Sequence, residues 1–154
     1  MVNHRGDSAL ETAKSAVADA SVIARWYVKE DQYQKALEVR EDYRKDLLNL
    51  VEPSLLLFEV SNALRYSPEL GADDVKNSVH SMVDLQFDIR ELDQEWASLC
   101  VESAYKYGIS IYDSTYVSLA QRLGIKFITA DEKLTRRIPK ENTVTLENYS
   151  LKQL

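Results

Sequence analysis

Short apolar runs alternate with amphipathic segments along the chain. The runs are typical of buried strands, and they occur at residues 16–19, 48–51, 87–90, 125–129 and 144–146. The segments between them carry apolar residues at helical spacing, which predicts helices. Strands that alternate with helices favour a parallel sheet covered on both faces. The sequence therefore predicts a three-layer α/β/α fold around a mostly parallel five-stranded sheet.

Local signals place several helix ends. Pro53-Ser54 predicts the start of a helix, with Ser54 as its N-cap, that continues to about residue 66. A charged segment at 31–47 predicts a surface helix. Gly108 and Gly124 predict the ends of two further helices, because glycine adopts the left-handed conformation of a helix C-terminus without strain.

Length and composition are those of one globular domain. A chain of 154 residues can bury a hydrophobic core that is stable without disulfides or a structural metal. With one cysteine, Cys100, and two histidines, the chain has no internal disulfide and little basis for a zinc site. No apolar run approaches the ~18 residues of a membrane span. We expect a flexible N-terminal extension at 1–14, a single domain at 15–154, and a cytoplasmic location.

Four acidic residues interrupt or end runs that should be buried: Asp19, Glu59, Asp113 and Asp131. A buried carboxylate is costly unless it is protonated, paired with a cation or bound to a metal. Few basic residues are next to these acids in the sequence, which favours one shared cation. Clustered carboxylate oxygens suit Mg²⁺ or Mn²⁺, and such a site can hydrolyse phosphodiesters.

The expected fold can bring these acids together although they are far apart in sequence. Asp19 and Asp131 follow predicted strands, and ligand sites in open parallel sheets lie beyond the carboxyl ends of the strands. Glu59 and Asp113 lie on helices that can point at the same edge. Asn62 shares a helix face with Glu59, and Thr129 precedes Asp131 by two residues on the same strand face.

Each of these residues also has a purely structural alternative. Asp19, Asp113 and Asp131 could be helix N-caps. Glu59 could pair with Arg65, although six residues place the two on different helix faces. The residues proposed to support the acids could be ordinary capping or packing residues: Ser21, Asn62 and Thr129.

The net charge of −6 argues against a broad basic surface for nucleic acid. Part of the negative charge would belong to the metal site, where bound cations reverse the local field. A local group of basic residues is either a nucleic-acid contact or a solvated helix end, and it comprises Lys126, Lys133, Arg136, Arg137 and Lys140.

Four segments together resemble the signature blocks of the PIN domain family, and of VapC-type toxins in particular. They are VADASVI (17–23), FEVSNAL (58–64), IYDSTYVSLA (111–120) and FITADEKL (127–134). Their order matches the family, and the resemblance runs from about residue 16 to the C-terminus. It implies a PIN-like sheet of order 3-2-1-4-5.

The resemblance implies roles for the same acids. Asp19, Glu59 and Asp113 correspond to the three principal acids of the family, and Asp131 to a more variable fourth. Ser21 falls where the family often has a Ser or Thr that hydrogen-bonds within the acidic site. By resemblance, the chain is expected to be a Mg²⁺- or Mn²⁺-dependent endoribonuclease that cuts single-stranded or loop RNA.

The resemblance also implies partners. VapC-type toxins pair with an antitoxin that inserts a basic side chain among the acids, and family members usually form homodimers. The surfaces at 55–57 and 33–37 are candidate walls of the antitoxin groove. Two other functions stay open: a housekeeping RNA-processing PIN nuclease without antitoxin, and a non-catalytic, receiver-like regulatory domain that binds Mg²⁺.

Overall fold

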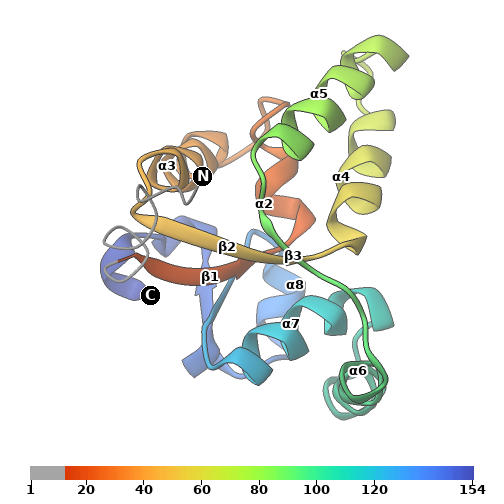
Figure 1. Cartoon of the computed structure of the whole chain (residues 1–154), viewed down its shortest axis with the longest axis vertical. Coiled ribbons are helices and arrows are strands. Elements are labelled where there is room, and N and C mark those ends of the chain that lie inside the picture. The colour runs from red at the N-terminus through yellow and green to blue at the C-terminus, as the bar shows by residue number, and fades with distance from the viewer. Residues whose placement is uncertain (1–12) are drawn as a thin grey trace, which may run out of the picture.

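The computed structural model describes residues 13–154, and its centre is a five-stranded parallel sheet (Figure 1). The strand order is β3-β2-β1-β4-β5 and every neighbouring pair is parallel, which confirms the predicted sheet. The strands are β1 (Lys14–Ala18), β2 (Leu48–Pro53), β3 (Asp88–Arg90), β4 (Lys126–Thr129) and β5 (Thr143–Thr145).

Helices cover both faces of the sheet, as the alternating pattern predicts. Figure 1 shows α2 to α5 on one side and α6 and α7 on the other. The α-helices are α2 (Ala20–Ala24), α3 (Tyr33–Arg44), α4 (Leu55–Arg65), α5 (Ala72–Asp84), α6 (Gln94–Tyr107), α7 (Ile111–Leu123) and α8 (Glu132–Thr135). Short 3-10 helices follow at Lys140–Asn142, Leu146–Asn148 and Leu151–Gln153.

The core lies between these layers and is densest around the central strand. Ala16, Val17 and Ala18 of β1 have no exposed surface. A parallel strand buried on both faces carries continuous apolar residues rather than an alternating pattern. This explains why the buried part of β1 is uninterrupted and apolar up to Asp19, whereas Lys14 and Ser15 at its start are not fully buried.

Two helix starts differ from the sequence prediction. Ser54 precedes α4 but does not cap it, because its backbone is already helical (φ −57°, ψ −23°) and an N-cap residue is normally extended. Its hydroxyl instead donates to Glu91 Oε2 at 3.1 Å. Helix α7 begins at Ile111, and its N-cap is Ser110, whose hydroxyl accepts from Asp113 N at 3.0 Å. Asp113 is therefore not a cap.

The helix C-termini at Gly108 and Gly124 are confirmed, with φ of 64° and 66°. Strand β1 starts at Lys14, which pairs with Leu48 of β2. The N-terminal extension expected at 1–14 lies almost entirely outside the described residues. From residue 13 to residue 154, no helix is both long and apolar enough to cross a membrane.

Candidate active site at the carboxyl end of β1

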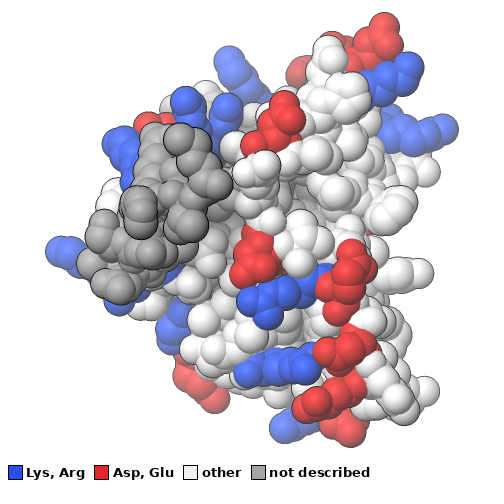
Figure 2. Space-filling view, in the orientation of Figure 1, with Lys and Arg blue, Asp and Glu red and all other residues white. Residues whose placement is uncertain are grey.

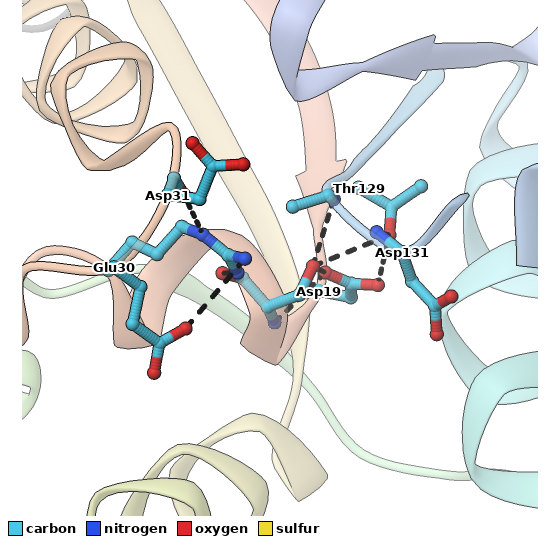
Figure 3. A network of polar contacts seen from close by, with 8 residues as sticks. Asp19, Glu30, Asp31, Thr129 and Asp131 are labelled. Carbon is cyan, nitrogen blue, oxygen red and sulfur yellow. Dashed lines mark hydrogen bonds and ion pairs between the residues drawn. The ribbon is translucent and has the colours of Figure 1, made fainter. Parts of the chain in front are cut away.

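Asp19 lies directly beyond β1, buried between two elements that both donate to it. Only 6% of its surface is exposed. Its Oδ1 accepts from Ser21 N at 3.1 Å, which caps α2, and also from the Ser21 hydroxyl. Its Oδ2 accepts from Thr129 Oγ1 of β4 at 2.6 Å. Figure 3 shows the Asp19 carboxylate turned toward Thr129 and Asp131. The capping alternative for Asp19 is therefore present in the structure.

Ser21 and Thr129 bind the end of β1 to the loop after β4. The Ser21 hydroxyl accepts from Ala130 N at 2.9 Å, and Thr129 Oγ1 accepts from Asp131 N at 3.0 Å. Each hydroxyl thus donates to the Asp19 carboxylate and accepts from the backbone near Asp131. These two side chains fix where the Asp19 carboxylate points.

Asp131 caps the short helix α8. Its Oδ1 accepts from Leu134 N at 3.1 Å. The residue is exposed, and the cap occupies one of its two carboxylate oxygens. The capping alternative is therefore present in the structure, and it leaves the other oxygen available to a ligand.

Glu59 and Asp113 are half-buried on α4 and α7. Burial is the main reason why the pKa of each carboxyl is raised, and the Asp113 charge raises the pKa of Glu59 further. The charge of Asp131 does the same to Asp113. Glu59 and Arg65 do not form an ion pair in the described part of the structure, so the alternative role of Glu59 as the partner of Arg65 is excluded.

Asp113 links the four acids electrostatically. Burial raises the pKa of Asp19 to about 6, and the charge of Asp113 contributes to that rise. Asp113 therefore interacts with Asp19, with Glu59 and with Asp131. Folding thus brings Asp19, Glu59 and Asp131 each within electrostatic range of Asp113.

These carboxylates do not form a tight cluster. Across the described part of the chain, no three His, Cys, Asp or Glu side chains come close enough together to hold a metal ion. The compact pocket expected from the sequence is thus not seen. Asn62 is exposed on α4 and makes no side-chain hydrogen bond to any described residue, so it does not join the network around Asp19.

Glu52, a fifth acid, was not predicted. It is fully buried at the end of β2, and its Oε1 accepts from Ala18 N at 2.7 Å. The β1–β2 pairing ends at Ala16 and Leu50, where β2 turns to pair with β3. Beyond this point the Glu52 carboxylate takes the place of a backbone partner for Ala18, the residue just before Asp19. A single acid between Val51 and Pro53, at the end of a mostly apolar strand, was the available signal.

Two buried polar side-chain atoms have no hydrogen-bond partner among the described residues. They are Glu52 Oε2 and the Tyr116 hydroxyl oxygen. Burial, followed by the Asp19 charge, raises the pKa of Glu52 well above its usual range. The Tyr116 hydroxyl lies near enough to Glu59 to lower the pKa of that carboxyl, although the pair lacks full hydrogen-bond geometry. The buried Tyr116 side chain of α7 therefore faces Glu59.

The donor set suits a hydrated divalent cation. All the candidate ligands are carboxylate oxygens, which Mg²⁺ and Mn²⁺ prefer, and Mg²⁺ keeps several waters when it binds. Carboxylates that raise one another's pKa would also be stabilised by a cation between them. The separation of the acids therefore fits an ion that some of them reach through water.

Comparison with known proteins places the chain in a family. The PIN domain model matches residues 16–140, and the chain belongs to the PIN domain family. Ribonuclease VapC3 of Pyrobaculum aerophilum is 29% identical over 129 residues, which cover 80% of this chain and 94% of that protein.

Solved structures share the fold. VapC20 of Mycobacterium tuberculosis, described as a toxin that cleaves the sarcin–ricin loop, has a TM-score of 0.62 and 11% identity, covering 79% of this chain and 93% of that one. A toxin–antitoxin complex from Klebsiella pneumoniae has a TM-score of 0.63 and 18% identity, with 85% and 97% covered. The observed strand order also differs from the 2-1-3-4-5 order of receiver domains, which excludes the receiver-like alternative.

Proposed function

We propose that this chain is a metal-dependent endoribonuclease, the toxin of a toxin–antitoxin pair, that hydrolyses single-stranded or loop RNA. Membership in the PIN family and similarity to a named ribonuclease support ribonuclease activity. One structural observation carries the rest: Asp19 is buried, held by Ser21 and Thr129, and electrostatically coupled to Asp113. A purely structural cap would not need this environment.

The side chains would act by position and charge. Asp19 and Asp113, with Glu59 and Asp131 directly or through water, would hold Mg²⁺ or Mn²⁺. When bound, the metal supplies a water of lowered pKa and neutralises charge on the phosphate. Ser21 and Thr129 keep the Asp19 carboxylate in a fixed orientation, and Glu52 holds the strand end beneath it. Asn62 remains a candidate supporting residue that would have to turn toward Glu59.

Cleavage of structured RNAs in Mg²⁺, Mn²⁺ or EDTA tests this function. We expect cleavage in the presence of metal and none in EDTA. Asp19→Asn and Asp113→Asn should each lose about 100-fold or more, because outer groups at metal sites alone contribute roughly 10- to 100-fold. Ser21→Ala should fall within that smaller range, because it removes a supporting group and keeps every carboxylate.

Asp73→Asn is the matched control, because Asp73 is an almost fully exposed acid on α5 whose only ion pair with a described residue is with Lys76. It should cleave like the wild type. Full metal-dependent cleavage by folded Asp19→Asn would refute the assigned site, and a wild-type chain that cleaves no RNA with either metal would refute the function.

The partner proposals follow from the same family. The Klebsiella pneumoniae neighbour is a toxin–antitoxin complex, which supports a protein partner for this chain as well. We place that antitoxin over the acids, where a basic side chain would be attracted to Asp113 and its neighbours. A small protein encoded by an adjacent gene, co-purifying with the chain, distinguishes the toxin from a housekeeping nuclease. Both would act on RNA in the cytoplasm, and we propose that the chain works there as a homodimer.

A further inference from the structure

The structure separates the basic residues near the C-terminus into two groups. Lys126 donates to the carbonyl of Glu141, and Arg137 donates to Gly108 O at 3.0 Å. These two cations bind backbone. Lys133, Arg136 and Lys140, in contrast, are exposed and have no hydrogen-bond or ion-pair partner among the described residues. The second group is therefore free to bind something else.

Arg136 and Lys140 line the same hollow. Its volume is about 380 Å³, and its other polar lining comes from threonine hydroxyls and from the amides of Asn148 and Gln153. No acidic side chain lines it. In a chain of net charge −6, where Figure 2 shows acidic and basic residues interspersed on the face in view, this is an unusual composition. The Thr135 and Thr143 hydroxyls already donate to backbone carbonyls. The two cations and the side-chain amides remain as donors, and they suit an anionic, hydrogen-bonding ligand.

The hollow adjoins the candidate active site. A smaller hollow of about 40 Å³ is lined by Thr129 and Asp131, and the two hollows share Thr135 and Thr145 in their linings. A ligand in the larger hollow would thus lie beside the loop that carries Asp131. The smaller hollow is bordered by acids, so an anion would be favoured in the larger one.

We propose that the larger hollow is a subsite for a nucleotide flanking the cleaved bond, in which Arg136 and Lys140 bind the RNA phosphate backbone. This inference rests on the proposed ribonuclease function. It explains how an acidic protein could retain a polyanion whose scissile phosphate lies among carboxylates. Binding through two cations releases counterions, so the affinity should depend on salt.

RNA binding by the full chain in EDTA tests the subsite without cleavage. The probe is a fluorescein-labelled, single-stranded RNA of mixed sequence, and fluorescence anisotropy gives Kd between 50 and 200 mM salt. The Arg136→Gln/Lys140→Gln variant should bind on the order of tenfold more weakly. The negative slope of log affinity against log salt should become shallower by about 1.4, which corresponds to the loss of two phosphate contacts on a single strand.

Lys45→Gln/Lys76→Gln is the matched control. It removes the same charge from two exposed lysines, Lys45 just after α3 and Lys76 on α5, whose ion pairs within residues 13–154 are with neighbouring acids. It should keep wild-type affinity and slope. If both double variants weaken equally, general charge explains binding and the subsite is refuted while the nuclease assignment stands. If the first variant binds RNA normally but loses the antitoxin, the hollow belongs to the protein partner and the proposal is wrong.

Discussion

At the scale of single residues, Asp19 places a carboxylate where burial opposes its charge. Its pKa is raised from 3.8 to about 6 in the folded chain, with the Ser21 and Thr129 hydrogen bonds already included. The folded state therefore holds its proton more tightly than the unfolded state. This contribution to stability is fully present below pH 3.8 and is lost as the pH rises through 6. A shift of this size corresponds to about 3 kcal/mol.

The stability of Asp19→Asn relative to the wild type should therefore rise by about 1 to 3 kcal/mol between pH 4 and pH 7.5. At pH 4 the wild-type carboxyl is protonated in the fold, and the two chains differ only in the hydrogen bonds that a carboxyl and an amide can make with Ser21 and Thr129. Urea unfolding in EDTA at the two pH values measures the difference. An equal difference at both values would show that burial of the Asp19 charge does not limit stability.

Glu52 permits a second residue-scale test, since its two oxygens have different surroundings. Glu52→Gln retains an acceptor for Ala18 N and should unfold within about 1 kcal/mol of the wild type at neutral pH. Glu52→Leu leaves that buried N–H without a partner and should be less stable than the Gln variant by about 1 to 3 kcal/mol. Urea denaturation compares them, and equal stability of the two variants would mean that the bond to Ala18 contributes nothing.

At the scale of elements, the helix ends determine where the site loops begin. Gly108 ends α6 just before the Ser110 cap that precedes Asp113, and Gly124 ends α7 just before β4. Both adopt left-handed backbone conformations. A Cβ on Gly108 would meet Arg137 Nη1 at 3.1 Å, whereas a Cβ on Gly124 would meet nothing within 4 Å.

Gly124→Ala should therefore cost only the backbone strain, about 1 to 2 kcal/mol. Gly108→Ala should cost more, because it also displaces the Arg137 guanidinium from Gly108 O. Thermal or urea unfolding ranks the two variants. In an Arg137→Ala background the extra cost at Gly108 should vanish, and its persistence there would exclude Arg137 as the cause.

At the scale of the whole molecule, α4 presents a large apolar side chain outward. Phe58 is 76% exposed although it directly precedes Glu59, and Tyr66 at the end of the helix is 72% exposed. If the chain is a homodimer, burial of this surface is the expected driving force.

We therefore predict a dimer by light scattering at micromolar concentration. Phe58→Glu should shift the chain toward monomer, because a charge on a buried apolar interface is costly. Tyr105→Glu, at an exposed aromatic residue on α6 across the sheet, should leave the dimer intact. A wild-type chain that is strictly monomeric would remove the dimer proposal.

The sequence by itself determined the parallel sheet, the ends of α6 and α7 and the candidate acids. Strand runs, helical spacing and glycine C-caps are local, because each depends on residues a few positions apart. Even the burial of Asp19 could be predicted, since it directly follows an apolar run that must be covered on both faces.

Tertiary structure alone decided the contacts between distant segments. It bonded Glu52 to Ala18 across a split in the sheet, turned the Tyr116 hydroxyl toward the acids and left Asn62 pointing outward. It also placed Lys126 and Arg137 against backbone carbonyls, whereas Arg136 and Lys140 contact no hydrogen-bond or ion-pair partner in residues 13–154. These contacts join residues that are far apart in the sequence, so they depend on how strands and helices pack against one another. The local spacing of residues does not specify that packing.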